Sequence, residues 1–442
     1  MHARVLPLPR GEGHDLEGAF VELAAAHANV FWLDAGVDAS EGWSFLGWGE
    51  LEADEALVNT RVGGISDRSD WSAGPFRGGW VGWAGYDAAA ESVGAPVAPQ
   101  DDDTPASAWI RATSWIAVDH ATGQSWAVSE SADHLEAWRD EAVHCVRAAT
   151  SSLEVSQDWQ IARERHTAHR YAELIEECRG AIRAGDAYQL CLTTRFSVAG
   201  AFDPVTVYRR LRATSRTGRG CFVRTRSAEG LSIALCSATP EQFLRVEGGV
   251  IRTRPIKGTR PRGADGGADA QLARELAESE KERAENVMIV DLMRNDLSRV
   301  CQPGTVRVDE LLAIESYPHV HQLVSAVSGE LRPEVTVGEV LQRTFPAGSM
   351  TGAPKLSAMT ILHQLEGGPR GAYAGCVGWV GEAGGLDLAM TIRTIVVTDG
   401  EAYVGAGGGI TWSSIVGEEV HEVGVKATAP LAAVGAHLPA GW

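Results

Sequence analysis

Apolar residues recur at helical spacing between residues 166 and 184. They are three or four positions apart, and Gly185 follows the segment. The apolar positions are Tyr171, Leu174, Ile175, Cys178 and Ile182. This spacing places the side chains on one face of a helix, and glycine commonly follows a helix C-terminus. The pattern predicts an amphipathic helix that ends at Gly185.

The first 150 residues have a different pattern, in which short apolar segments are broken by Gly, Pro and Asp. Three of these segments are FWLDAG (31–36), WSFLGWG (43–49) and GGWVGWAGYD (78–87). Such segments are typical of antiparallel strands joined by turns. More than half of the 14 tryptophans lie in this part of the chain. We expect them to pack in the core or on strand faces, with a small aromatic pocket as the alternative.

The remaining chain changes irregularly between strand-like and helix-like segments. We expect strands at 188–198, along 234–258 and within 388–397 and 403–410, helices at 204–213 and 271–299, a flexible loop at 262–270, and a final helix from about Gly417. The absence of a regular βαβ repeat favours an α+β fold over a doubly wound sheet. A β-rich part over residues 1–160 and a second part over 161–442 are the expected organisation, with an acidic, Ser-rich connection between them.

Composition narrows the class of protein. The chain has 442 residues, of which 44% are hydrophobic, and its formal net charge is −19. This charge argues against a nucleic-acid partner, which needs a basic face, but allows an anionic metabolite where cationic groups or a divalent cation gather locally. Because no run of about 18 apolar residues and no apolar N-terminal stretch occurs, we expect a soluble, cytoplasmic protein without a membrane partner. Seven scattered cysteines, none in a CxxC pair, predict reduced core thiols.

Lysine is scarce in this chain. Four lysines stand against 35 arginines, and they are Lys257, Lys281, Lys355 and Lys426. A desolvated Lys amine can act as a nucleophile or as a compact hydrogen-bond donor. The Arg guanidinium is forked and permanently charged, so it cannot take over either role. Three of the four lie in motifs marked by Gly or Glu, namely PIKGTRPRG, GSMTGAPK and EEVHEVGVKA. These lysines are therefore candidate functional residues, with chance placement as the alternative.

Two acidic pairs lie in segments that we expect to be helical. Glu282 precedes Glu285 by three residues, and Glu419 precedes Glu422 by the same spacing. Each pair would occupy one helix face, and two facing pairs would form an all-oxygen site suited to Mg²⁺. A solvated acidic face is the alternative from spacing alone. Lys426, four residues after Glu422, is compatible with an ordinary helical ion pair.

Two further segments indicate an anion site. Gly407, Gly408 and Gly409 lie between a predicted strand and the final helix, where backbone N–H groups can approach an anion, although a tight turn is equally compatible. Lys257 precedes a Gly-Thr pair, and Glu241 is sixteen residues earlier in a neighbouring predicted strand. Glu241 is thus a candidate acid/base partner. The sequence contains no phosphate-binding loop, dinucleotide fingerprint or nucleophile elbow.

Together these motifs resemble the chorismate-utilising enzymes, most closely the component I group of aminodeoxychorismate synthases. The resemblance is dense from residue 168 to 428 and is carried by AYQLCLTTRF, TPEQFLRV, RPIKGTRPRG, ENVMIVDLMRNDLSRVC, PGTVRVDEL, HVHQLVSAVSG, FPAGSMTGAPK, YAGCVGW, LAMTIRTI, GGGI and GEEVHEVGVKA. It implies an α+β fold in which two large antiparallel β-sheets pack as a sandwich with flanking helices. The two parts of the chain would then form one closely joined unit.

The resemblance also implies which nucleophile reaches chorismate. Isochorismate and salicylate synthases have a water-activating Lys at the position of Gln189, and anthranilate synthases have Ala at the position of Lys257. The resemblance therefore implies amination to 4-amino-4-deoxychorismate, in which Lys257 attacks C2, the C4 hydroxyl leaves, and ammonia adds at C4 and displaces the lysine. A separate glutaminase subunit would supply the ammonia, and the product would feed 4-aminobenzoate for folate or an aminated secondary metabolite.

The remaining roles follow from the same resemblance. Glu241 would be the acid/base, and Mg²⁺ would be bound directly by Glu285 and Glu422 and through water by Glu282 and Glu419. The substrate contacts would be Gln189, Gly258, Thr259, Ser349, Tyr373, Arg393, Gly407, Gly409 and Lys426. In some relatives the N-terminal part holds tryptophan, which makes tryptophan a candidate ligand there.

One position departs from the family pattern. Gln322 stands immediately before Leu323, where the family usually has a His that is thought to interact with the departing C4 oxygen. Gln can donate a hydrogen bond but cannot deliver a proton, so more of this task would fall on Glu241. His321 is one residue away and would point to the other face of a strand. Anthranilate synthase component I and a catalytically silent regulatory subunit are the alternatives.

Overall fold

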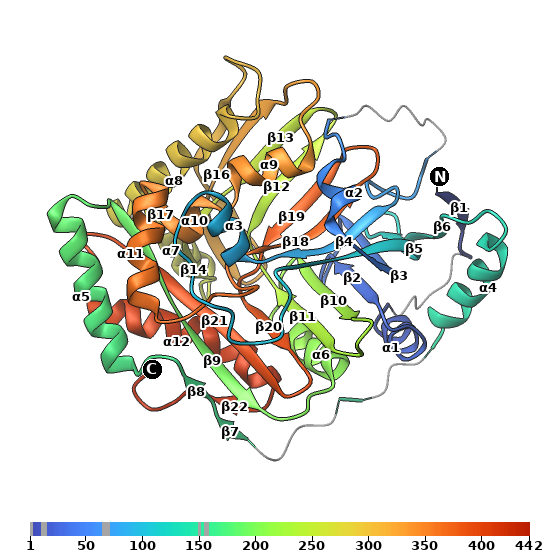
Figure 1. The fold of residues 1–442 in the computed structure, drawn as a ribbon, viewed down its shortest axis with the longest axis horizontal. Coiled ribbons are helices and arrows are strands. Elements are labelled where there is room, and N and C mark those ends of the chain that lie inside the picture. The colour runs from blue at the N-terminus through green and yellow to red at the C-terminus, as the bar shows by residue number, and fades with distance from the viewer. Residues whose placement is uncertain (1–2, 10–15, 64–70, 149–151, 154–158) are drawn as a thin grey trace.

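The structure is a computed structural model that describes residues 3–9, 16–63, 71–148, 152–153 and 159–442. Most of the expected connection around residues 149–158 lies outside this part. The described strands form one large antiparallel network and one small parallel pair, with helices on the outside (Figure 1). The α+β class expected from the sequence is confirmed.

One half of the network is a curved sheet of long strands. Its order in space is β1 (Arg4–Pro7), β6 (Gln124–Ser129), β5 (Ser107–Asp119), β3 (Trp43–Glu52), β2 (Val30–Asp34), β10 (Gly220–Arg226), β11 (Ser232–Ala238), β20 (Thr394–Val397), β21 (Glu401–Ile410) and β9 (Gln189–Ala199), with β8 (Arg163–Glu164) and β17 (Gly352–Ala353) also paired to β9. The pair between β2 and β10 joins strands from the first 160 residues to the rest of the chain.

The other half begins again at β5. Its order is β5, β4 (Gly79–Ala84), β18 (Cys376–Gly381), β19 (Leu386–Met390), β12 (Gln242–Glu247), β13 (Val250–Arg254) and β16 (Val320–Glu330), and β16 also pairs with β14 (Ile256–Pro261) and β15 (Arg307–Ser316). The two expected sheets are thus continuous through β5, which pairs with β3 along most of its length, with β6 over Ser114–Asp119 and with β4 over Ser107–Arg111. A separate parallel pair joins β7 (Gln160–Ile161) to β22 (Ala436–His437).

Side chains on alternate strand positions face different cores, because successive strand residues point to opposite sides of a sheet. On β10, Cys221 and Val223 pack between the two sheets with Trp83 of β4, whereas Phe222 packs outward against Phe20. The outer faces are covered by helices. They are α1 (Leu16–Ala26), α4 (Leu135–Cys145), α5 (Ala168–Ala184), α6 (Pro204–Thr214) and α12 (Val416–Ala433) on one side, α2 (Asp54–Val58), α3 (Tyr86–Ser92), α8 (Glu280–Ser298), α9 (Val337–Thr344) and α10 (Gly348–Thr351) on the other, and α11 (Lys355–Glu366) between them.

Most predicted elements appear where the sequence placed them. The helix expected at 166–184 is α5, which is capped by the Thr167 side chain and followed by Gly185 at φ +86°. The strand at 188–198 is β9, the helix at 204–213 is α6, and the last helix is α12. The N-terminal part, expected to be strands and turns, also contains α1, α2, α3 and α4.

One predicted helix and the loop before it are wrong. The segment 271–299 is not a single helix, because α7 (Gly266–Glu278) ends at Ser279 and α8 begins there. The Ser279 side chain accepts a hydrogen bond from the Glu282 amide and so caps the second helix. The expected loop at 262–270 is correspondingly shorter, since the Asp265 side chain caps α7 from Gly266 onward.

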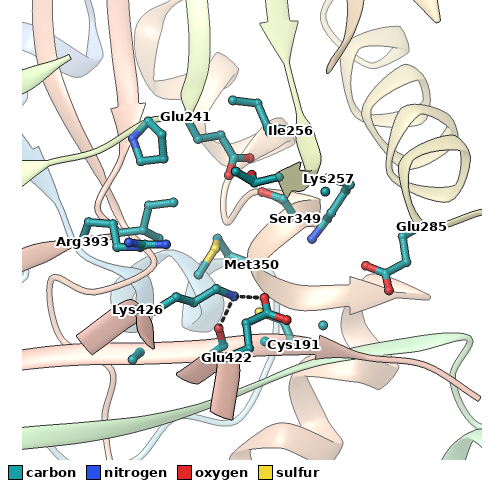
Figure 2. A pocket seen from close by; sticks show the side chains of 18 of the residues that line it. Cys191, Glu241, Ile256, Lys257, Glu285, Ser349, Met350, Arg393, Glu422 and Lys426 are labelled. Carbon is teal, nitrogen blue, oxygen red and sulfur yellow. Dashed lines mark hydrogen bonds and ion pairs between the residues drawn. The ribbon is translucent and has the colours of Figure 1, made fainter. Parts of the chain in front are cut away.

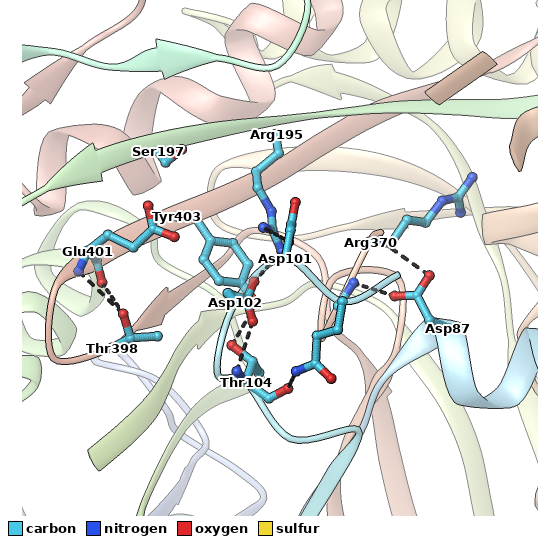
Figure 3. Close-up of polar contacts among 12 residues, drawn as sticks. Asp87, Asp101, Asp102, Thr104, Arg195, Ser197, Arg370, Thr398, Glu401 and Tyr403 are labelled. Atoms are coloured by element: carbon cyan, nitrogen blue, oxygen red, sulfur yellow. Dashed lines mark hydrogen bonds and ion pairs between the residues drawn. The ribbon is translucent and has the colours of Figure 1, made fainter. Parts of the chain in front are cut away.

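The buried Arg370 ties several of these elements together; Figure 3 shows it beside Asp87, whose carboxylate accepts from the Arg370 backbone N–H. The Arg370 guanidinium donates to both carboxylate oxygens of Glu366 at 2.8 and 2.7 Å, to Met350 O at 2.6 Å and to Cys191 O at 2.8 Å. It also lies over the Tyr86 ring, with 4.2 Å from Cζ to the ring centroid. One side chain therefore joins β9, α3, α10 and the end of α11.

No helix among the described residues is long and apolar enough to span a membrane.

Replacement of Arg370 tests this connection. Arg370→Met leaves the Glu366 carboxylate buried without its cation, and we expect a loss of about 3–5 kcal/mol in the free energy of unfolding. Urea denaturation followed by circular dichroism measures it. The control is Arg332→Met, which removes the exposed ion pair with Glu339 and should cost about 1 kcal/mol or less. Equal losses in the two variants would contradict the structural role of Arg370.

Candidate active site

A cavity of about 470 Å³ lies where β14, β21, α8 and α12 approach one another (Figure 2). Every site residue that the sequence predicted lines it, except Gln189. These residues are Glu241, Lys257, Gly258, Thr259, Glu282, Glu285, Gln322, Ser349, Tyr373, Arg393, Gly407, Gly409, Glu419, Glu422 and Lys426. Segments that are more than 180 positions apart in the chain thus meet at one place.

Lys257 reaches the cavity from an irregular point of β14. The pairing of β14 with β16 shifts register between Ile256 and Thr259, and Gly258 has φ +87°, a conformation that favours glycine. Burial would lower the pKa of Lys257, but nearby negative groups, Glu285 foremost, outweigh it and hold the pKa above its usual value. The ammonium form is therefore favoured, and attack by this amine requires a base that removes its proton.

Glu241 is the group suited to take this proton from Lys257. Its side chain is buried, and burial raises the pKa of its carboxyl group against the opposing effects of Lys257 and of the Ser349 hydroxyl, which hydrogen-bonds to it. In Figure 2 Glu241 and Lys257 lie on the same side of the cavity. A carboxyl group with a raised pKa beside a lysine is suited to exchanging a proton with it.

The four glutamates of the two acidic pairs face the cavity but are partly paired with cations. Lys281 Nζ lies 2.9 Å from Glu419 Oε1, and Lys426 Nζ lies 2.7 Å from Glu422 Oε1. Glu282 Oε1 is 3.6 Å from an Arg260 nitrogen. Within the described residues, no three His, Cys, Asp or Glu side chains are gathered closely enough to hold a metal ion together. The predicted Mg²⁺ site therefore stays a prediction.

Glu285 is the glutamate most suited to a cation. Its Oε1 atom is buried and has no hydrogen-bond partner among the described residues. Burial raises the pKa of its carboxyl group to about 7. An unpartnered carboxylate oxygen among other carboxylates is the kind of hard donor that Mg²⁺ prefers, so the residues present fit this ion.

Gln189 lies just behind the cavity wall. It is 1% exposed, and its amide oxygen and nitrogen have no hydrogen-bond partners among the described residues. A Cβ atom on Gly409 would lie 2.3 Å from its Nε2 atom. The absence of a side chain at Gly409 thus lets the Gln189 amide approach the cavity.

Gln322 and His321 occupy opposite faces of β16, as the strand alternation predicts. Gln322 lines the cavity, next to Thr259 in the strand pairing. His321 instead hydrogen-bonds through Nδ1 to Ser316 Oγ at 2.8 Å and through Nε2 to Asp269 Oδ1 at 3.0 Å. His321 therefore does not replace the usual histidine in the cavity.

Tyr373 and Arg393 form another side of the cavity. Arg393 has φ +51° and interrupts the strands between Met390 and Thr394, and burial lowers its pKa. Gly405 provides space for Tyr373, since a Cβ atom there would lie 2.1 Å from the ring carbon Cγ.

Sequence reasoning missed several residues of the wall. They are Cys191, Pro240, Ile256, Arg260, Lys281, Met350, Ile392, Gly405, Ala406 and Val425. The sequence could have indicated Lys281 as a site residue, because it is one of only four lysines and adjoins Glu282. The apolar residues of the wall could not be recognised, since any core position looks similar in the sequence.

A second cavity of about 470 Å³ lies beside Asp101, Asp102 and Glu401 (Figure 3). It contains none of the predicted site residues.

Comparison with known proteins identifies the class to which this fold and site belong. The chain belongs to the family of chorismate binding enzymes, whose profile matches residues 35–432. The solved anthranilate synthase component I from Streptococcus pneumoniae superimposes with a TM-score of 0.74 at 27% identity, covering 98% of this chain and 92% of that one. The isochorismate synthase MenF from Escherichia coli has the same fold, with a TM-score of 0.72 at 16% identity over 98% and 94% of the two chains.

Among curated relatives, aminodeoxychorismate synthases and anthranilate synthases both match. The aminodeoxychorismate synthase of Streptomyces pristinaespiralis is 40% identical over 81% of this chain, and component 1 of the Salmonella typhimurium enzyme is 39% identical over 77% of this chain and 73% of its own length. Component 1 of anthranilate synthase from Mycolicibacterium smegmatis is 35% identical over 98% and 91%. The chain spans only 51% of the length of the Streptomyces pristinaespiralis enzyme and 57% of the length of the aminodeoxychorismate synthase of Streptomyces griseus.

The contact between Gly405 and Tyr373 predicts the effect of one added methyl group. Gly405→Ala overfills the wall and displaces the Tyr373 ring, and we expect a loss of about 1–3 kcal/mol in the free energy of unfolding. Denaturant titration measures it. Gly400→Ala, in the turn before the same strand, meets nothing within 4 Å and is the matched control. Equal stability of the two variants would contradict the close contact.

The raised pKa of Glu285 predicts a pH-dependent effect. Because the folded protein binds this proton more tightly than the unfolded chain, the wild type loses stability as pH rises from about 4.5 to about 7. Glu285→Gln removes this loss, so its stability relative to wild type should rise by about 2–3 kcal/mol between pH 5 and pH 8 with a chelator present.

Urea denaturation at the two pH values measures this change. The exposed Glu418→Gln on α12 controls for the loss of one negative charge. A stability difference between wild type and Glu285→Gln that is the same at both pH values would contradict the pKa shift.

Proposed function

We propose that this chain aminates chorismate to 4-amino-4-deoxychorismate with ammonia. The observation that carries the proposal is the placement of Lys257 beside Glu241 in a cavity that also contains Arg393 and Lys426. A nucleophilic amine, a carboxyl group with a raised pKa and two cations are the groups needed to bind a dianion and exchange its hydroxyl group. The relatives named aminodeoxychorismate synthase support this function.

The chemistry proposed for the chain begins with a proton transfer. The Glu241 carboxylate takes a proton from the Lys257 ammonium and becomes a neutral acid. The free amine forms a bond to C2 of chorismate, both ring double bonds shift by one position, and the C4 hydroxyl leaves as water with the proton of Glu241. Ammonia then forms a bond to C4, the two double bonds return to their original positions, and the bond between C2 and the Lys257 nitrogen breaks, after which the released Lys257 amine takes up the proton lost from the new amino group. The amine thus divides one difficult displacement into two easier ones.

Other residues of the wall bind and orient the substrate. The Arg393 guanidinium and the Tyr373 hydroxyl would hold the enolpyruvyl carboxylate, since a guanidinium can bind a carboxylate through two hydrogen bonds. Gly258, Thr259, Gly407, Gly409 and Lys426 would contact the ring carboxylate, with Ser349 nearby. The Gln322 amide would donate a hydrogen bond to the departing oxygen, and Gln189 would leave the approach open to ammonia rather than activate water.

Mg²⁺ is proposed as the cofactor, held directly by Glu285 and Glu422 and through water by Glu282 and Glu419. When bound, it would offset the negative charge of the substrate's ring carboxylate within an acidic protein. Ammonia is proposed to come from a glutaminase partner.

The alternative function is that of an anthranilate synthase component I, which the match to the Mycolicibacterium protein favours. Lys257 disfavours it, because a nucleophilic lysine has no role in forming anthranilate.

Product analysis tests the proposed function. The purified chain is incubated with chorismate, Mg²⁺ and ammonium at mildly alkaline pH, and the products are identified by mass spectrometry. A product that retains the enolpyruvyl group and has an amine in place of the hydroxyl supports the proposal. Anthranilate as the product would contradict it, and so would the absence of any chorismate consumption.

The role of Lys257 gives a separate prediction. Lys257→Ala and Lys257→Arg both lack a nucleophilic amine, and we expect each to lose at least about 100-fold in the rate of aminodeoxychorismate formation. The Arg variant keeps the positive charge and so separates the chemical role from electrostatics. Intact-protein mass spectrometry of the quenched wild-type reaction should show a covalent adduct that is absent from both variants. Turnover by Lys257→Ala at the wild-type rate would remove the covalent mechanism.

A further inference from the structure

Lys281 reaches into the cavity from the beginning of α8 and holds a buried carboxylate. Its Nζ atom donates to Glu419 Oε1 at 2.9 Å, and Ser414 Oγ donates to the same oxygen at 2.7 Å. The Glu419 side chain is 3% exposed, whereas the Lys281 side chain is 34% exposed. The lysine thus lies partly in solvent while its partner is enclosed. This ion pair neutralises one of the four glutamates to which the proposed function assigns a divalent cation.

The second lysine near these glutamates is held more firmly. Lys426 Nζ contacts Glu422 Oε1 at 2.7 Å, as a dashed line in Figure 2 shows. It also donates to Gly407 O at 2.8 Å. For Lys281 Nζ, Glu419 is the only hydrogen-bonding partner that the described residues provide. A lysine with one partner and a flexible four-carbon stem can turn into solvent more easily than one fixed to the backbone.

We propose that Lys281 is an exchangeable internal counter-ion, which a divalent cation entering the cavity displaces from Glu419. The inference rests on the proposed Mg²⁺ site. Two cations that share one enclosed carboxylate repel each other, because charges in a poorly hydrated cavity are weakly screened. Entry of the divalent ion therefore favours rotation of the Lys281 ammonium into solvent, where water replaces Glu419 as its partner.

The exchange has two consequences for the protein. Without a divalent cation, the Lys281 ammonium relieves the repulsion among Glu282, Glu285, Glu419 and Glu422, which supports the folded cavity. With a divalent cation, the energy of breaking the ion pair is subtracted from the binding energy, so the apparent affinity for the metal is lower than the intrinsic affinity of the glutamates. Lys281 would thus set the Mg²⁺ concentration at which the site fills.

Isothermal titration of the full chain with Mg²⁺ alone tests the affinity. Lys281→Met removes the competing ammonium, and its dissociation constant for Mg²⁺ should be roughly 3- to 10-fold lower than that of wild type. Arg283→Met removes a positive charge from the exposed side of the same helix without touching Glu419, and it should leave the constant within about 2-fold. Equal dissociation constants for wild type and Lys281→Met would overturn the proposal.

The scarcity of lysine allows a direct measurement of the displacement. Each of the four lysines can be quantified by peptide mass spectrometry after brief acetylation, with and without saturating Mg²⁺. Acetylation of Lys281 should increase at least about 3-fold on Mg²⁺ binding, because its amine leaves Glu419 for solvent. Lys355, held by Asp296 Oδ2 at 2.7 Å and Thr344 O at 3.3 Å, is the internal reference and should not change.

The outcomes separate this inference from the proposed function. Mg²⁺ binding to wild type with unchanged Lys281 acetylation would overturn the counter-ion role while leaving the metal site intact. If neither wild type nor Lys281→Met binds Mg²⁺, the metal part of the proposed function fails and the inference fails with it. Product formation from chorismate, measured separately, shows whether amination itself persists.

Discussion

The buried ion pair between Arg370 and Glu366 is the interaction on which the geometry of the cavity depends. A guanidinium taken out of water must have its charge balanced and its N–H groups bonded, otherwise its burial is very costly. Here Glu366 balances the charge, and the carbonyl groups of Met350 and Cys191 accept the remaining bonds. Because Met350 and Cys191 both belong to the cavity wall, the same contacts that satisfy the arginine also fix the distance between β9 and α10.

The cavity itself is electrically balanced although the protein is strongly acidic. Five cationic side chains and five glutamates line it, whereas the whole chain has a formal net charge of −19. The members of each sign are Lys257, Arg260, Lys281, Arg393 and Lys426, and Glu241, Glu282, Glu285, Glu419 and Glu422. Such a local balance allows an anion to enter against the overall field, and it places proton acceptors next to the one amine that must lose a proton.

The sequence revealed the parts of this protein that depend on local periodicity or on dense motifs. Helix α5 was predictable because its apolar spacing and Gly185 agree. The lysines, the paired glutamates and the glycines of the cavity were candidates from the sequence pattern, whereas Gln322, Tyr373 and Arg393 were predictable only through the resemblance to the chorismate-utilising enzymes. The break between α7 and α8 was not, since Ser279 interrupts an otherwise helical composition without Gly or Pro. The ion pair of Lys281 with Glu419 and the contacts of Arg370 join positions far apart in the chain, and only the folded arrangement brings them together.

The sharing of β5 between the two sheets bears on how this protein can be shortened. Removing the first 160 residues would take away β2 and β4, and would leave β10 and β18 as bare edges of their sheets. Strands that are buried on both faces become templates for intermolecular pairing when an edge is freed. A truncated catalytic fragment is therefore an aggregation hazard rather than a minimal enzyme. Insertions or fusion points are better placed in turns such as that around Gly123, where an added Cβ atom would meet nothing within 4 Å.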